Sequence, residues 1–171
     1  IARLLVDKGL REYYDAARQL RQVHPQARFL LAGPLDPNPM SIREDELKRW
    51  QADGAIEYLG RLDDVRPAYA AARVYVLPSY REGTPRTVLE AMATGRPIIT
   101  TDAPGCRETV VDGDNGFLVP VKDVAALKDA MERFILEPEL ARRMGEASLR
   151  LANDKYDVHK VNSIIMGAMG L

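Results

Sequence analysis

Short apolar segments recur along the chain, and longer amphipathic segments separate them. Most of the short segments carry apolar residues at consecutive positions rather than at every second position. This pattern is typical of strands that are covered on both faces, as in a parallel sheet between helices. The segments that we predict to be strands are Ala2–Leu5, Ala27–Ala32, Ile56–Leu59, Val74–Leu77, Pro97–Thr101 and Phe117–Val119.

The segments between the strands have the periodicity of helices. The predicted helices are Gly9–His24, a helix capped by Ser41 with Glu44 that runs to Ala52, Val65–Ala72, Thr87–Ala93 closed by Gly95, Val124–Leu136 capped by Asp123, a helix opened by Pro138 that reaches Asn153, and Val158–Gly170. If the last helix packs against another domain, Ile164, Ile165, Met166 and Met169 would form an apolar patch on this chain by itself.

The alternation of strand and helix predicts an α/β fold: a doubly wound, Rossmann-like parallel sheet flanked by helices. No repeat, linker or low-complexity segment divides residues 1–171, so we expect a single domain. Because Ala2–Leu5 has the pattern of a strand end, we also expect a further segment before it in the natural protein. Sheets of this kind bind ligands at the carboxyl ends of their strands, so the loops that follow the strands are the first candidates for a site.

Composition narrows the classes of function. The apolar fraction is 46%, the charged fraction is 29% and the net charge is −1, so no overall positive field attracts nucleic acid or an anionic membrane. No apolar run approaches the roughly 20 residues needed to cross a bilayer. The single cysteine, Cys106, cannot form an internal disulfide, which favours a cytoplasmic location.

The densest chemical signal is the segment from Pro78 to Ala93, which follows a predicted strand and ends in a helix. Gly83 lets the backbone approach a ligand closely, and the free amides of the helix's first turn favour an anion such as a diphosphate. Glu82 and Glu90 could each accept hydrogen bonds from a pair of sugar hydroxyls. Taken alone, however, the two glutamates are better explained as solvated surface acids.

Two cations lie at the end of the first predicted strand. Arg3 and Lys8 would project at the same edge of the sheet as the loop that contains Glu82. Two cations near a helix N-terminus can clamp a diphosphate and stabilise the charge that grows on it as it departs. The alternative is a pair of solvated surface cations.

Other motifs are missing or uninformative. No G-x-G-x-x-G follows the first strand and no G-x-x-x-x-G-K-[ST] occurs, which argues against a nicotinamide-dependent oxidoreductase and a P-loop ATPase. Cys106 has no neighbouring cysteine or histidine, so neither a metal site nor a nucleophilic cysteine is expected.

Several segments together resemble retaining glycosyltransferases of the GT-B fold, in their group 1 (family 4) form. Glu82–Glu90 resembles the E-x7-E element of that family, and Gly116–Pro120 resembles its G-x-L-V segment. Arg3 and Lys8, each followed by the expected residue, resemble its R-L…K-G element. Leu59–Arg61 resembles its F-L-G segment. These elements occur in family order, although the glycine that often precedes the arginine is Ala2 here.

The resemblance implies a role for each matching residue. Arg3, Lys8 and Glu82 would act in catalysis, the two cations by supporting departure of the donor diphosphate. The expected donor-binding residues are Gly83, Thr84, Pro85, Glu90, Leu59, Gly60 and Arg61, with Glu90 on the ribose and residues 59–61 near the base. No metal and no cofactor is expected, because the cations and the helix dipole take the place of a metal.

The resemblance also implies an activity. The chain would be the C-terminal half that binds a nucleotide diphosphate sugar, favouring UDP, for retaining transfer to an acceptor hydroxyl in bacterial surface polysaccharide or lipid-linked glycan synthesis. A missing N-terminal half would bind the acceptor and make any membrane contact, and this half alone would be inactive. Two alternatives stay open: a glycogen or starch synthase type of enzyme, and a non-catalytic nucleotide- or phosphate-binding module.

Overall fold

The computed structural model describes residues 1–169, apart from the side chain of Ile164. Its elements alternate along the chain as expected: η1 (Val6–Lys8), α1 (Leu10–Val23), β1 (Leu30–Leu31), α2 (Glu44–Ala52), β2 (Glu57–Tyr58), α3 (Arg66–Ala71), β3 (Tyr75–Leu77), α4 (Arg86–Ala93), β4 (Ile98–Thr101), η2 (Arg107–Thr109), β5 (Gly116–Val119), α5 (Val124–Leu136), α6 (Pro138–Lys155) and α7 (Val158–Ala168). The helices and the parallel strands confirm the predicted α/β class.

The strands β1 to β5 of the described residues all pair in parallel. β1 pairs with β2, and β4 lies between β3 and β5. In the central strand β4, Ile98 packs into a core that contains Val88 and Met92 of α4. The next residue, Ile99, packs into a second core that contains Leu20 of α1. Neighbouring residues of one strand therefore face two different helical layers, which is why the strand is apolar at consecutive positions.

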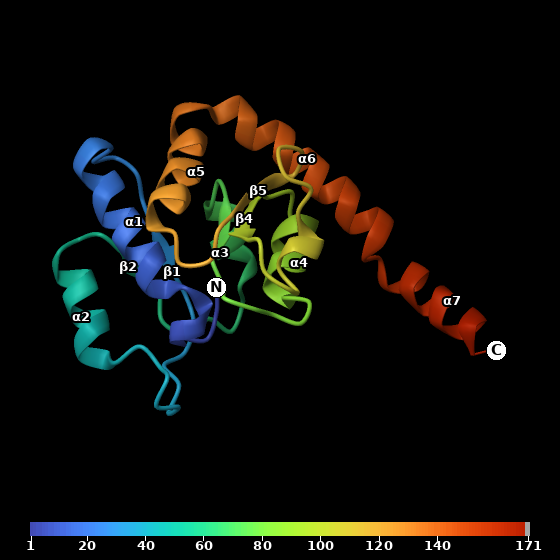
Figure 1. Cartoon of the computed structure of the whole chain (residues 1–171), viewed down its shortest axis with the longest axis horizontal. Helices are drawn as coiled ribbons and strands as arrows, with labels where there is room; N and C mark the ends of the chain where they lie inside the picture. The colour runs from blue at the N-terminus through green and yellow to red at the C-terminus, as the bar shows by residue number, and fades with distance from the viewer. Residues whose placement is uncertain (170–171) are drawn as a thin grey trace.

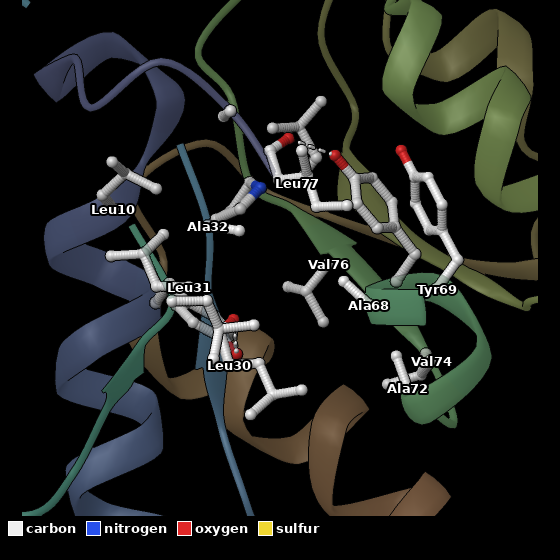
Figure 2. A pocket seen from close by; sticks show the side chains of 16 residues that line it. Leu10, Leu30, Leu31, Ala32, Ala68, Tyr69, Ala72, Val74, Val76 and Leu77 are labelled. Atoms are coloured by element: carbon white, nitrogen blue, oxygen red, sulfur yellow. Dashed lines mark hydrogen bonds between the residues drawn. The ribbon is translucent and has the colours of Figure 1, made fainter. Parts of the chain in front are cut away.

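The expected single sheet is divided among the described residues into a two-stranded and a three-stranded ladder. A cavity of about 60 Å³ lies between them, and Figure 2 shows Leu31 of β1 and Val76 of β3 on opposite sides of it. The prediction of a strand at Ala2–Leu5 was wrong. Residue 2 donates to Ala32 O (3.0 Å), but Leu5 then forms an antiparallel bridge with Ser41, so no regular ladder develops.

The start of α2 also differs from the prediction. Ser41 does not cap this helix, which begins at Glu44 after Arg43 and has no side-chain cap. The Ser41 hydroxyl instead donates to Leu4 O (2.8 Å), and the amide of Ile42 donates to the same oxygen (2.7 Å). Ser41 is therefore used to hold the N-terminal segment in place.

Three other capping predictions are confirmed. Asp123 accepts a hydrogen bond from the amide of Ala126 (2.9 Å) at the start of α5. Pro138 occupies the first turn of α6, where its missing amide proton costs nothing. Gly95 follows α4 with φ of 69°, and the amide of Arg96 returns to Ala91 O (3.0 Å), which closes the helix.

Helix α7 extends away from the rest of the molecule beyond α6 (Figure 1). Its apolar side chains Ile165, Met166 and Met169 are 50%, 47% and 66% exposed. The side chain of Ile164, the fourth residue expected in this patch, and the whole of Gly170, the predicted helix end, lie outside the described part of the chain.

Because this exposed apolar face would gain free energy from burial, we expect the chain to self-associate at high concentration. Sedimentation velocity should show a dimer, and the double variant Ile165→Ser with Met169→Ser should raise the dissociation constant of this dimer at least tenfold. Val23→Ser, which removes an equally exposed apolar side chain from α1, is the control (64% exposed). A chain that stays monomeric at millimolar concentration would contradict this expectation.

None of the helices in residues 1–169 is long and apolar enough to cross a membrane.

Candidate functional site

The candidate site forms where three loops meet at the carboxyl ends of β3 and β4. The loop after β3 contains residues 78–85 and leads into α4, and the loop after β4 contains residues 102–106. Because β3 and β4 are adjacent parallel strands, their following loops start side by side. The third loop is η1 with its closing Gly9.

The η1 turn is held against the loop after β3 by backbone contacts. The carbonyl of Asp7 accepts hydrogen bonds from the amide of Tyr80 (2.8 Å) and from the Ser79 hydroxyl (3.0 Å). Gly9 has φ of 70°, and a Cβ built on it would lie 2.0 Å from Pro78 O. Only glycine fits this turn without displacing the neighbouring loop.

This docking brings Lys8 to Glu82. The Lys8 ammonium lies 2.6 Å from Glu82 Oε1, and the two side chains are only 15% and 14% exposed. They are 74 residues apart in the sequence, so only the tertiary structure pairs them. A mostly buried pair of this kind positions both groups, because either charge would be costly to leave there without the other.

The loop after β4 packs against the backbone of Glu82 and Gly83. Gly105 has φ of +81°, and a Cβ built on it would lie 2.0 Å from Glu82 O and 2.1 Å from Gly83 O. The amide of Glu82 donates to Pro104 O (3.0 Å). The backbone at Glu82 and Gly83 is therefore set by residues from another loop, a constraint that the sequence analysis did not find. The Pro-Gly pair was the available signal, since it marks a turn.

Helix α4 begins at Arg86, after Pro85. In its first turn the amide of Val88 donates to Pro85 O (2.9 Å), while the amides of Arg86 and Thr87 have no acceptor within the helix, and the preceding Gly83 and Thr84 are exposed. This is the arrangement expected for anion binding, with Lys8 and Glu82 beside it.

Glu90 lies one turn further along α4. The Tyr69 hydroxyl of α3 lies 3.0 Å from both Glu90 Oε2 and the carbonyl oxygen of Thr87, and it shares its one proton between these two acceptors. Tyr69 is 2% exposed. Burial is the main cause that raises the pKa of Tyr69, followed by the neighbouring Tyr75 and Glu90, so the hydroxyl keeps its proton. Tyr69 was not predicted, and its position in an ordinary helical stripe carries no signal.

Arg3 is placed differently from the expected clamp. Its side chain is 65% exposed, and its guanidinium lies 3.4 Å from Asp36 in the loop after β1. Among the described residues its side-chain hydrogen bond goes to Asp36 and not to the loop that contains Glu82. The structure thus joins Lys8 to Glu82 and leaves Arg3 at the neighbouring loop.

The residues expected near the base follow β2. Leu59 is 39% exposed, and Arg61 is paired at 3.9 Å with the fully exposed Asp63. Gly60 has φ of 71°, and its carbonyl accepts from the amide of Gly33 (2.8 Å). The loops after β1 and β2 are thereby tied together. Leu59 also lines the cavity between the ladders, which at about 60 Å³ is far too small for a nucleotide.

Two further groups near these loops, the Cys106 thiol and the Tyr80 hydroxyl, have raised pKa values. Burial raises the pKa of the Cys106 thiol, which keeps it protonated and unreactive. Burial and then the hydrogen bond to Glu12 raise the pKa of Tyr80 to about 12. Within residues 1–169, no three His, Cys, Asp or Glu side chains are close enough together to hold a metal ion.

Comparison with known proteins identifies related sequences. A curated enzyme of Campylobacter jejuni, N,N'-diacetylbacillosaminyl-diphospho-undecaprenol alpha-1,3-N-acetylgalactosaminyltransferase, is 35% identical over 142 residues, which is 83% of this chain and 36% of that enzyme. The chain thus spans little more than a third of the length of this curated relative.

Solved structures share the fold. HepE of Anabaena, crystallised with UDP, superposes with a TM-score of 0.89 over 99% of this chain and 47% of its own, at 24% identity. The C-terminal domain of the group 1 glycosyltransferase LpcC from Francisella tularensis superposes with a TM-score of 0.82 over 92% of this chain and 84% of its own, at 25% identity. The chain has the Rossmann-like architecture of one half of a GT-B glycosyltransferase.

The family model described as "Glycosyl transferases group 1" matches residues 1–137, the part of the chain that contains η1, the loops after β1 to β4 and all of α4. Together with the identity to the Campylobacter enzyme, this match shows that the chain belongs to the group 1 glycosyltransferases.

Proposed function

We propose that this chain is the donor-binding, C-terminal domain of a retaining glycosyltransferase and that its donor is a UDP-sugar. The observation that carries the proposal is the Lys8–Glu82 pair, closed at 2.6 Å beside the N-terminus of α4. A cation, a helix N-terminus and a carboxylate at one loop can bind the diphosphate and the sugar of one donor. The UDP complex of HepE, which shares the fold, supports the choice of donor.

Each group has a separate task in this proposal. Lys8 and the first-turn amides of α4 bind the diphosphate and stabilise it as it leaves. Glu82 and the backbone of residues 83–85 contact the sugar, and Glu90 accepts from the ribose hydroxyls. Residues 59–61 lie along the base. Arg3 reaches the diphosphate by leaving Asp36, which its 65% exposure permits.

The chemistry proposed is substitution at the anomeric carbon with retention. Lys8, Arg3 and the α4 dipole stabilise the negative charge that develops on the leaving diphosphate, without a metal ion. The departing phosphate oxygen takes the proton of the acceptor hydroxyl, so this domain needs no side-chain base. The bond between the anomeric carbon and the phosphate oxygen breaks, and a bond between the anomeric carbon and the acceptor oxygen forms. The proton of the acceptor hydroxyl moves to the phosphate oxygen.

An N-terminal half of the longer protein would bind the acceptor, make any membrane contact and complete the site by closure. The chain alone is therefore expected to bind donor and to transfer no sugar. We propose a cytoplasmic location and a role in bacterial surface polysaccharide or lipid-linked glycan synthesis. The single, unpaired cysteine is in keeping with a reducing compartment, and the Campylobacter relative is named for a lipid-linked acceptor.

Calorimetric titration of the chain with UDP, GDP and ADP tests the proposal. We expect saturable binding of UDP, weakened about tenfold or more by Glu90→Ala and by Arg3→Ala, since each removes a charge-assisted contact. Arg11→Ala, which breaks a similarly exposed pair with Glu46, should leave the affinity unchanged.

A preference for GDP or ADP would contradict the choice of UDP. Absence of binding by both this chain and the longer protein would overturn the donor-binding function itself.

A further inference from the structure

The carboxylate of Glu90 is held on one side only. Tyr69 donates to Oε2 at 3.0 Å, and in the described part of the chain Oε1 has no hydrogen-bond partner. Glu90 is half-buried on α4, with Tyr69 beneath it on α3. One oxygen is therefore fixed by the protein and the other is available to a ligand.

The hydroxyl that holds Glu90 is itself rigidly placed. The Tyr69 ring packs against Tyr75 of β3, with ring centroids 5.7 Å apart. The Tyr75 hydroxyl bonds to the Thr87 hydroxyl (2.8 Å) and to Ile1 O (2.7 Å), and the Tyr69 hydroxyl shares its proton with the Thr87 carbonyl (3.0 Å). Two buried tyrosines thus tie the first turns of α4 to α3 and to the sheet.

We propose that Tyr69 is a positioning residue for the nucleotide: it orients the Glu90 carboxylate so that Oε1 is ready to accept from ribose hydroxyls. This role rests on the proposed function. A glutamate side chain on a helix surface samples several rotamers, and restricting them before the ligand arrives reduces the entropy lost on binding. Tyr69 touches no ligand atom in this role and acts only through Glu90.

The test compares UDP with its 2′,3′-dideoxyribose analogue, which lacks the hydroxyls that Glu90 would bind. Both are titrated into the unmodified chain and into Tyr69→Phe. We expect Tyr69→Phe to weaken UDP binding about tenfold and to leave the affinity for the analogue unchanged. A merely structural role of Tyr69 would lower both affinities by the same factor, and that result would overturn the proposal.

Tyr75→Phe is the matched control. It removes a hydroxyl from the same buried cluster, one that bonds to Thr87 and to Ile1 O and not to Glu90. Thermal unfolding of both variants shows the temperature range in which each is folded, and all titrations are made within it. We expect Tyr75→Phe to keep the preference for UDP over the analogue. If Tyr75→Phe also loses this preference, the preference depends on the whole tyrosine cluster, and the specific role of Tyr69 is overturned.

A double variant separates this proposal from the proposed function. In a Glu90→Ala background, Tyr69→Phe should weaken UDP binding no further, because its effect passes through Glu90. An additional loss would overturn the positioning role while leaving the donor-binding function intact. Failure of the unmodified chain and of the longer protein to bind UDP would overturn both.

Discussion

Replacing Lys8 with methionine is expected to reduce sugar transfer by the complete enzyme about a hundredfold to a thousandfold, the usual effect of removing one group that stabilises transition-state charge. Methionine keeps most of the volume of the side chain but loses the ammonium that lies 2.6 Å from Glu82. The loss should be mainly in kcat, because the charge on the departing diphosphate is greatest in the transition state. Steady-state kinetics measure it.

Replacing Lys8 with methionine is also expected to lower the stability of the fold, and this effect has to be separated from the loss of kcat. Without Lys8 the carboxylate of Glu82, which is 14% exposed, loses its counter-ion. Lys8→Met with Glu82→Gln should therefore regain stability without regaining activity. Lys48→Met is the control, since Lys48 forms an equally short pair with Glu44 (2.7 Å) on the solvated face of α2. A Lys8→Met enzyme with ordinary kcat would exclude Lys8 from catalysis.

Gly105→Ala is expected to destabilise the chain by about 3 kcal/mol or more, because both the backbone conformation and the packing forbid a Cβ. The new atom would lie 2.0 Å from Glu82 O and 2.1 Å from Gly83 O, so the loop that contains Glu82 would have to move. UDP binding should weaken together with stability. Urea denaturation measures the first effect and calorimetry the second.

Gly113→Ala is the matched control for this prediction. Gly113 has φ of +80°, against +81° for Gly105, but nothing lies within 4 Å of its Cβ position. Its replacement should cost only the left-handed strain, about 1–2 kcal/mol, and should leave nucleotide affinity unchanged. Equal losses of stability and of UDP affinity for the two variants would show that the backbone at Glu82 moves at little cost and that Gly105 does not fix its position.

The helices and the class of fold were largely readable from the sequence. Helix-period stripes and local caps such as Asp123 and Pro138 act over a few residues, so their signals lie within the segments that they bound. Consecutive apolar residues at Ile98 and Ile99 correctly indicated a strand covered on both faces. Strand pairing was less predictable, since it joins distant segments: three of the four residues of Ala2–Leu5 are apolar, as in a strand, but the segment ends in a bridge to Ser41.

The candidate site shows the same division. The sequence placed Glu82 and Glu90 after the carboxyl end of β3, because each lies at a fixed offset from a strand or a helix start. It also placed Lys8 beside them, although the strand expected before Lys8 did not form. It could not show that Lys8 pairs with Glu82, that Arg3 faces Asp36, or that Tyr69 holds Glu90. These contacts join residues 21 to 74 positions apart, and nothing local records them.

The sequence by itself thus determined the α/β class, most of the helices and the residue types available at the carboxyl edge, because these depend on periodicity and on short-range backbone chemistry. Only the tertiary structure decided which side chains meet, how the two ladders are separated, and why Gly9 and Gly105 must be glycine. The physical reason is that close packing between distant loops sets these features, and such packing has no counterpart in any local pattern of the chain.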